Sequence, residues 1–167
     1  MKQLIFVCGT MGVGKTTACR ELQKQLPHNV FLDGDWCWDA RPFVVNERTR
    51  ALVQDNITHM LNNFIACPDY ENVIFCWVMH EQSIIDELKR RLRGRYQLRV
   101  FALVCDEAEL RRRIESDIAR GLRTPDVLER SLPRLKLYDA LDAQRIDVTR
   151  LTPAQTAAAI VNSLQQH

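Results

Sequence analysis

The chain has 167 residues, a length that suits one domain with its own hydrophobic core. Hydrophobic residues make up 46% of the sequence and charged residues 26%, both typical of a globular protein, and no apolar run is long enough to span a membrane. The formal net charge of +2 excludes a polycation held mainly by nucleic-acid phosphates, so any anion site must be local.

The N-terminus and the cysteines lead to expectations about location. Met1 and Lys2 precede an apolar run that lacks the features of a secretory signal, so we expect a cytoplasmic protein that does not contact a membrane. From its length we expect a single domain over residues 1–167. The six cysteines include no Cys-x-x-Cys pair, and several lie within apolar runs. We interpret them as reduced and structural.

A glycine-rich loop lies between the first predicted strand, residues 4–7, and the first predicted helix, residues 17–26. It fills every fixed position of the pattern G-x-x-x-x-G-K-[ST], and the strand, loop and helix order is the context that this pattern requires. The residues of the loop are Gly9, Thr10, Met11, Gly12, Val13, Gly14, Lys15 and Thr16.

The residue types in this loop suit a bound polyphosphate. The glycines permit backbone conformations that turn several N–H groups toward one anion, and the helix N-terminus adds further donors. We expect the whole loop and Thr17 to contact ATP, with Lys15 reaching the β- and γ-phosphates and the Thr16 hydroxyl binding Mg²⁺. Nothing in the sequence distinguishes ATP from GTP.

Two carboxylates, Asp33 and Asp35, follow the second predicted strand at residues 29–32. The carboxyl ends of the strands form the ligand-binding edge of an open α/β sheet, so Asp35 is expected to face the γ-phosphate and to help bind the metal. Asp33 is either a second site residue or a turn residue that stabilises its own loop.

Residues near this acidic loop are candidates for an acceptor pocket. Arginines suit phosphates and carboxylates, and a tryptophan can stack on a flat substrate, although a solvated helix end or half-buried packing explains the same residues. A helix is predicted over residues 46–64 and a strand over residues 73–79. His80 directly follows this strand and is either a substrate contact or a packing residue. The candidates are Asp33, Asp35, Trp36, Arg41, Arg48 and His80, and the same reasoning applies to Trp38 and Arg50.

A basic run over residues 89–95 ends the next predicted helix, residues 81–93, and is either a solvated face or a nucleic-acid patch. A strand over residues 98–104 follows, and Asp106 with Glu109 predicts a capping box for the helix after it.

Three charged residues recur at helical spacing after that box. Arg113, Asp117 and Arg120 share a helix face, Gly121 ends the helix, and Arg123 follows. We interpret residues 113–130 as a mobile lid whose arginines close over phosphates, and the alternative is an exposed helix pair with ordinary charges. A further helix is predicted from about residue 126 to 141.

The last elements are a strand at residues 145–148 and a helix that begins at a capping Thr152 followed by Pro153. Strands and helices alternate along the whole chain. This alternation predicts an α/β fold with a five-stranded parallel sheet covered by helices on both faces, in three layers.

With these landmarks the chain resembles the P-loop small-molecule and nucleotide kinase superfamily. The matching segments are residues 9–16, the Asp33-Gly34-Asp35 turn, the arginine segment 113–123 and the Ile146-Asp147-Val148-Thr149 stretch. The acidic turn is similar to that of adenylylsulfate and gluconate kinases, and an aspartate near it is the catalytic base in polynucleotide kinase and chloramphenicol phosphotransferase. The resemblance implies strand order 2-3-1-4-5, Asp35 as base, and Arg113 and Arg120 as lid arginines on ATP.

The expected function is therefore transfer of a phosphoryl group from ATP, with Mg²⁺, to a small-molecule or nucleotide acceptor. The expected catalytic residues are Lys15, Asp35, Arg113 and Arg120, with Arg123 also on ATP and with Thr16 and Asp35 as metal ligands. Nucleic acid is not expected as a partner, and the protein is expected to be a monomer or a homodimer.

Three alternatives are weighed against this expectation. A GTPase switch is disfavoured, because no Asp-x-x-Gly or Asn-Lys-x-Asp sequence follows the loop. An AAA-type or regulatory ATPase finds support in the apolar residues 101–105 that end in Asp106-Glu107. A polynucleotide 5′-hydroxyl kinase finds support only in the basic run.

Overall fold

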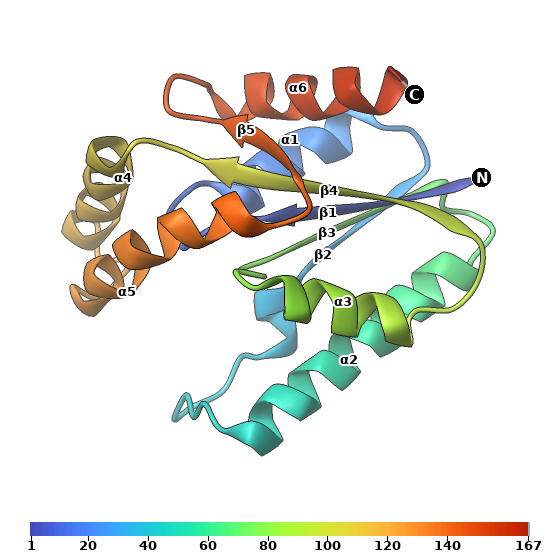
Figure 1. The fold of residues 1–167 in the computed structure, drawn as a ribbon, viewed down its shortest axis with the longest axis horizontal. Coiled ribbons are helices and arrows are strands. Elements are labelled where there is room, and N and C mark those ends of the chain that lie inside the picture. The colour runs from blue at the N-terminus through green and yellow to red at the C-terminus, as the bar shows by residue number, and fades with distance from the viewer. Residues whose placement is uncertain (167) are drawn as a thin grey trace.

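The structure, a computed structural model, describes residues 1–166, and five parallel strands form one sheet within that range (Figure 1). The strand order is β2-β3-β1-β4-β5, as the resemblance implied. The strands are β1 (Lys2–Cys8), β2 (Asn29–Asp33), β3 (Asn72–Trp77), β4 (Tyr96–Val104) and β5 (Gln144–Asp147). Every residue of β3 is buried, as expected for a parallel sheet with both faces covered.

Two helices cover each face of the sheet (Figure 1). Helices α1 (Lys15–Gln25) and α6 (Pro153–Gln165) lie on one face, and α2 (Glu47–Ala66) and α3 (Gln82–Arg91) on the other. Apolar side chains from β1 alternate between the two resulting cores, with Ile5 and Val7 in the first and Leu4 and Phe6 in the second. The predicted three-layer α/β fold is confirmed.

The remaining two helices, α4 (Glu107–Ala119) and α5 (Asp126–Arg134), lie beyond the carboxyl ends of the strands (Figure 1). The loop after β1 leaves the sheet at the same edge. Residues far apart in the sequence therefore meet at this edge, as the doubly wound topology requires. No helix within residues 1–166 has the length and apolar character to cross a membrane.

Two local predictions are corrected. The capping box at Asp106 is wrong, because the Glu109 carboxylate binds Arg112 and Arg113 instead of the helix N-cap. The helix predicted to reach residue 141 is α-helical only to Arg134 and continues as a 3₁₀ helix, η2 (Leu135–Ala140). Pro133 lacks the backbone N–H that an α-helix needs at this point.

The final helix forms as its sequence predicts. The Thr152 hydroxyl accepts a hydrogen bond from the Gln155 N–H, and the Gln155 side chain accepts one from the Thr152 N–H. Pro153 occupies the first turn, where its missing N–H costs nothing. This cap fixes the start of α6 beside the loop that follows β5.

Candidate active site

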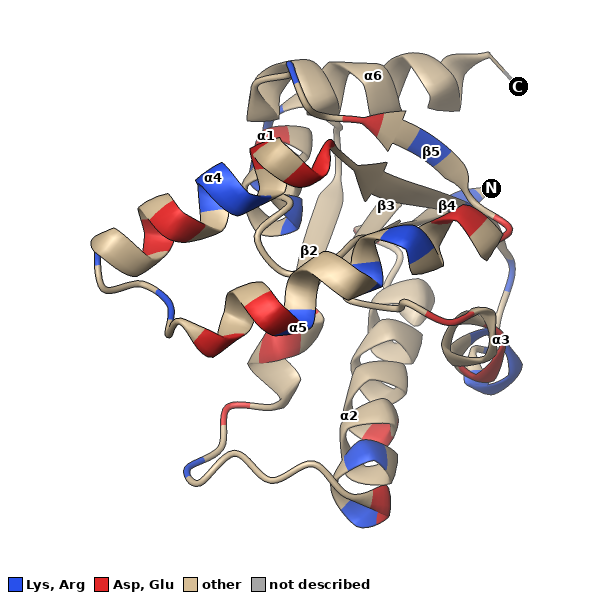
Figure 2. Cartoon of the chain, turned by 60° about the vertical axis from the view of Figure 1, so that its left-hand side comes forward, with Lys and Arg blue, Asp and Glu red and all other residues tan. Residues whose placement is uncertain are grey.

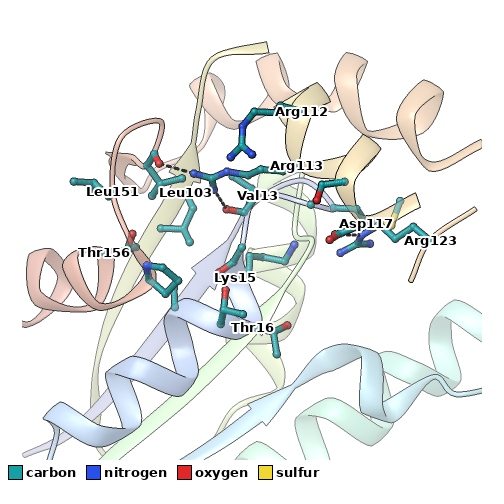
Figure 3. A pocket seen from close by; sticks show the side chains of 18 of the residues that line it. Val13, Lys15, Thr16, Leu103, Arg112, Arg113, Asp117, Arg123, Leu151 and Thr156 are labelled. Carbon is teal, nitrogen blue, oxygen red and sulfur yellow. Dashed lines mark hydrogen bonds and ion pairs between the residues drawn. The ribbon is translucent and has the colours of Figure 1, made fainter. Parts of the chain in front are cut away.

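The glycine-rich loop forms the floor of a cavity of about 490 Å³ (Figure 3). Gly12 and Gly14 adopt φ angles of +87° and +99°, in the left-handed region that favours glycine. Gly14 immediately precedes the first residue of α1, so the helix N-terminus opens into the cavity. This arrangement provides backbone donors and the positive end of a helix dipole at one point, as an anion site needs.

Lys15 lies in the middle of this cavity (Figure 3). Its Nζ donates a 3.1 Å hydrogen bond to the Thr10 carbonyl, within the same loop. Burial is the main cause of a lowered Lys15 pKa, which the carboxylates of Asp35 and Asp33 partly offset. An anionic ligand would replace the lost hydration of this ammonium group.

The loop threonine contacts Asp33, at the end of β2. The Thr16 hydroxyl donates a 2.6 Å hydrogen bond to Asp33 Oδ2, and Asp33 Oδ1 accepts a 3.0 Å bond from the Asp35 N–H. Asp33 is buried, and its two carboxylate oxygens have different partners. One oxygen stabilises the turn that Asp33 itself begins, and the other contacts the phosphate-binding loop, so the two alternatives for Asp33 both describe it in part. Sequence reasoning paired Thr16 with Asp35 as metal ligands, and the structure instead brings Asp33 to Thr16.

The Asp35 carboxyl lies one turn further along, in the 3₁₀ helix η1 (Gly34–Cys37). Although Asp35 keeps contact with solvent, partial removal from water raises its pKa, and the negative charge of Asp33 raises it further. Lys15 and Arg123 act in the opposite direction. A carboxyl whose pKa is moved toward neutrality is a suitable proton acceptor.

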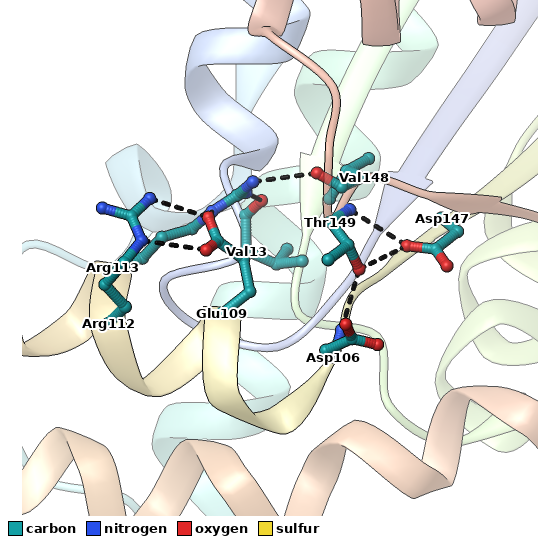
Figure 4. Close-up of polar contacts among 8 residues, drawn as sticks. All are labelled: Val13, Asp106, Glu109, Arg112, Arg113, Asp147, Val148 and Thr149. Atoms are coloured by element: carbon teal, nitrogen blue, oxygen red, sulfur yellow. Dashed lines mark hydrogen bonds and ion pairs between the residues drawn. The ribbon is translucent and has the colours of Figure 1, made fainter.

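Arg113 connects the phosphate-binding loop to the segment after β5 (Figures 3 and 4). Its Nη1 donates to the Val13 carbonyl at 2.9 Å, its Nη2 to the Val148 carbonyl at 2.8 Å, and its Nε to Glu109 at 2.7 Å. Hydrogen bonds from Arg112 and then Arg113 lower the Glu109 pKa to about 2. Arg113 lines the cavity, and its guanidinium already binds two backbone carbonyls in this structure.

The other two predicted arginines share one carboxylate. Arg120 Nη2 lies 2.7 Å from Asp117 Oδ1, and Arg123 Nε lies 3.0 Å from Asp117 Oδ2. All three side chains line the cavity, and Figure 2 shows acidic and basic residues interleaved along α4 and α5. The ion pairs with Asp117 therefore keep the guanidinium groups of Arg120 and Arg123 at the cavity wall.

The cavity also contains residues that sequence reasoning missed. Arg112 and Ser116 line it from α4. Each immediately precedes a residue of the predicted helix face, Arg113 or Asp117, so a prediction that allowed a wider face would have included both. A largely apolar wall opposite the loop comes from β4, the β5–α6 segment and α6. Its members are Leu103, Val148, Leu151, Pro153 and Thr156.

A second cavity of about 460 Å³ adjoins the first. The two cavities share three lining residues, Met11, Lys15 and Asp35. The residues that line the second cavity come from the loop after β1, the start of α1, the β2–α2 segment, α2, β3, the β3–α3 segment, α3 and α5. They are Met11, Lys15, Asp35, Trp38, Phe43, Val45, Arg50, Gln54, Trp77, Val78, His80, Glu81, Ile84, Arg130 and Arg134.

Of the six predicted acceptor residues, Asp35 and His80 line this cavity and the other four do not. Asp33 contacts Thr16, as described above. The Trp36 ring packs against Phe31, at 5.3 Å between ring centroids, and under the Arg20 guanidinium. Arg41 and Arg48 are exposed. The cavity is lined by Trp38 and not Trp36, and by Arg50 and not Arg48. Trp38 directly follows the 3₁₀ helix η1, and Arg50 lies in the first turn of α2.

His80 reaches the cavity after a sharp bend, since the buried Met79 before it has a φ of +33°. Its Nε2 lies 3.4 Å from the Glu81 carboxylate, and its buried Nδ1 has no hydrogen-bond partner among the described residues. Burial and then the charge of Arg134 lower the His80 pKa. Arg134, with Arg130 one helical turn before it, was also missed, although their i, i+4 spacing on α5 is visible in the sequence.

A family model described as an AAA domain matches residues 5–126 of the sequence. Comparison with curated proteins found no match. Among solved structures, a sugar kinase from Janibacter sp. HTCC2649 has a TM-score of 0.74 and 16% identity, over 99% of this chain and 95% of that one.

Two further solved structures show the same likeness. A gluconokinase from Sinorhizobium meliloti 1021 has a TM-score of 0.66 and 20% identity, over 99% of this chain and 98% of that one. A fungal RNA kinase has a TM-score of 0.62 and 15% identity, over 100% of this chain and 87% of that one. Their shared architecture, together with the loop and the strand order, confirms the expected P-loop kinase fold, and the family match shows that this chain belongs to the AAA domain family.

Proposed function

We propose that this chain is a phosphotransferase that moves the γ-phosphoryl group of ATP to a hydroxyl group of a small-molecule acceptor. One observation carries the proposal: the phosphate-loop cavity and the second cavity meet at Lys15 and Asp35. A donor phosphate and an acceptor hydroxyl, one in each cavity, would approach each other between an ammonium group and a carboxylate. Phosphoryl transfer needs this combination of positioning and charge.

The first cavity fits a nucleoside triphosphate. The loop donors and Lys15 suit the phosphates, and the apolar wall at Val148, Leu151 and Pro153 suits a base. The Thr16 hydroxyl and the Asp33 carboxylate, 2.6 Å apart, supply the oxygen donors that Mg²⁺ prefers. When bound there, Mg²⁺ would neutralise negative charge on the transferring phosphates.

The proposed step uses Asp35 as the base. The acceptor oxygen forms a bond to the γ-phosphorus while the bond from that phosphorus to the β–γ bridging oxygen breaks, and ADP leaves. The proton of the acceptor hydroxyl passes to the Asp35 carboxylate. Lys15 stabilises the charge on the transferring group throughout.

Residues 113–130 act in this proposal as an arginine-bearing lid. Arg120 and Arg123 would exchange their shared Asp117 for phosphate oxygens when a nucleotide binds, because a guanidinium binds phosphate with charge-assisted hydrogen bonds. Arg113 contributes mainly by holding the loop in place through the Val13 carbonyl.

A mechanical ATPase is a second candidate, because the matching family model is described as an AAA domain. Its expected Mg²⁺-binding pair would be Asp106-Glu107, after β4. The Asp106 N–H donates a 2.9 Å hydrogen bond to the Thr149 hydroxyl (Figure 4). Asp106 lines a separate cavity with Asp139 and Asp147 instead of the phosphate-loop cavity. This placement favours the phosphotransferase.

A polynucleotide end is a further candidate acceptor, since a fungal RNA kinase shares the fold. The basic run of α3 is its support in this chain, but Glu87 pairs with both Arg90 and Arg91 within that run. Oligonucleotide binding that falls steeply with salt would favour this acceptor.

The test is a screen of acceptors with Mg²⁺ and ATP, scored by ADP release above slow hydrolysis and by the mass of the phosphorylated product. The Lys15→Ala variant is the control, and it should lose ATP affinity and turnover together. If Lys15→Ala kept both unchanged with an acceptor that the wild-type protein phosphorylates, the assignment of the phosphate site would be wrong.

A further inference from the structure

The second cavity has a composition that restricts its ligand. It is lined by four cationic residues, two acidic residues, one histidine and seven apolar or aromatic residues. Among the described residues that line it, Gln54 is the single neutral amide, and no serine, threonine or asparagine joins it. Charged and apolar side chains, and not neutral polar ones, therefore dominate this lining.

The aromatic part of the lining suits a flat molecule. Trp38 and Trp77 line the cavity, and the Trp38 ring packs against Phe43, with 4.8 Å between ring centroids. Phe43 and Val45 are 56% and 51% exposed, so a ligand seated against them would cover apolar surface that now meets water. The volume of about 460 Å³ lies within the range of small-molecule sites, roughly 300–1,000 Å³.

Two of the four cationic side chains that line the cavity, Arg50 and Arg134, have no ion-pair partner among the described residues. Within residues 1–166, no ion pair or side-chain hydrogen bond engages the guanidinium of Arg50 or of Arg134, whereas Arg130 pairs with Asp126 at 2.8 Å. The half-buried Arg134 lies close enough to His80 to lower its pKa, and the His80 Nδ1 also lacks a partner in the described structure. An anionic group on the ligand would satisfy these groups together.

Asp35 and the two arginines without partners line the cavity from different elements. Asp35 and Lys15 mark the end shared with the phosphate-loop cavity, while Arg134 comes from α5 and Arg50 from the start of α2. We infer that the acceptor is a flat aromatic or heteroaromatic molecule that carries a hydroxyl group and a carboxylate or phosphate, with the anion bound at Arg134 and the hydroxyl facing Asp35. This inference rests on the proposed function for the reaction, but not for the binding.

Tryptophan fluorescence provides a binding test that does not depend on transfer. The chain has three tryptophans; Trp38 and Trp77 line the cavity, and a Trp36→Phe background removes the one that packs elsewhere. The probes are matched pairs: nucleoside monophosphates with their nucleosides, and aromatic hydroxy acids with their amides. Phosphate and carboxylate sources of the anion are thereby distinguished, and gluconate and glucose represent polyhydroxylated ligands.

We expect at least one anionic aromatic probe to bind with an affinity about tenfold or more above that of its neutral partner. Arg134→Gln should abolish this difference, and Arg134→Lys should restore part of it. Arg95→Gln is the matched control, because Arg95 is exposed and immediately precedes β4, at the opposite ends of the strands. Equal binding of the neutral partners, tighter binding of gluconate or glucose, or no binding of any anionic aromatic probe at millimolar concentration would each overturn the inference.

The outcomes separate this inference from the proposed function. Anion-selective binding that depends on Arg134, without ADP release, would contradict the phosphotransferase and leave the ligand class in place. Conversely, phosphorylation of a neutral sugar that Arg134→Gln leaves unchanged would confirm the phosphotransferase and refute the ligand class.

Discussion

The Thr16 hydroxyl donates a 2.6 Å hydrogen bond to the buried Asp33 carboxylate, which joins the first helix to the end of the second strand. Asp33, rather than Asp35, is thereby placed beside the threonine that is expected to bind Mg²⁺. The two aspartates have different neighbours, so their substitution should have different effects.

Asp33→Asn should raise the Mg²⁺ concentration that gives half-maximal ATP-dependent turnover, by about 10–100-fold, as is typical when a ligand-orienting group of a metal site is lost. ATP binding in EDTA should change little. Asp39→Asn is the control, because Asp39 is exposed in the same segment. An unaltered Mg²⁺ requirement in Asp33→Asn would remove Asp33 from the metal site.

Asp35→Asn should lower phosphoryl transfer by about 10²–10⁴-fold, as expected for a lost general base, and leave ATP affinity nearly unchanged. The wild-type rate should fall as the pH drops through the Asp35 pKa, because protonation removes the base. Partial removal from water and the negative charge of Asp33 hold that pKa above the ordinary value of 3.8, so this acidic limb should lie above pH 3.8. Kinetics from pH 4 to 8 provide the measurement.

The same pH profile offers an internal check. Since the negative charge of Asp33 raises the Asp35 pKa, Asp33→Asn at saturating Mg²⁺ should move the acidic limb to lower pH. If the limb persisted in Asp35→Asn, it would belong to another group.

Arg113→Gln should destabilise the protein by about 2 kcal/mol, because it removes charge-assisted hydrogen bonds to the Val13 and Val148 carbonyls. The melting temperature should fall by roughly 2–4 °C per kcal/mol for a chain of this size. ATP affinity should fall as well, since the loop loses its clamp. The neighbouring Arg112, 68% exposed and paired with Glu109, provides Arg112→Gln as the control, which should change the melting temperature much less.

Arg123→Gln should reduce turnover by about tenfold or more if the lid arginine stabilises transferred charge. Its ion pair with Asp117 is near the surface, so the melting temperature should change little. Single-turnover kinetics with saturating ATP measure the effect on transfer. A variant with normal turnover would restrict Arg123 to its pair with Asp117.

Gly34→Ala should impair the acceptor side of the site. A Cβ at residue 34 would lie 2.5 Å from the Trp77 ring, so the ring or the turn must shift, at a cost of about 1–3 kcal/mol. Trp77 lines the second cavity, and acceptor binding should therefore weaken more than ATP binding. Fluorescence titration with acceptor and with ATP, each alone, distinguishes the two effects.

The first helix shows why much of the fold could be predicted. The buried strand, the glycine loop and α1 are adjacent in the sequence, and their hydrophobic spacing and glycine positions specify a local unit. The alternation of such units implies a parallel sheet. The predicted capping box at Asp106 was wrong because Glu109 has several possible partners within reach. Its spacing from Asp106 fits a capping box, but its spacing from Arg112 and Arg113 fits ion pairs equally well, and spacing alone does not decide between these partners.

The sequence by itself determined the phosphate-binding loop, the order of strands and helices, and the edge of the sheet where Lys15, Asp35 and Arg123 gather. Only the tertiary structure decided which aspartate contacts Thr16, that Arg113 binds a carbonyl 100 residues away, and that Trp38 rather than Trp36 lines the second cavity. The reason is physical: helix and strand periods are set by local backbone geometry, whereas side-chain partners depend on which distant surfaces pack together.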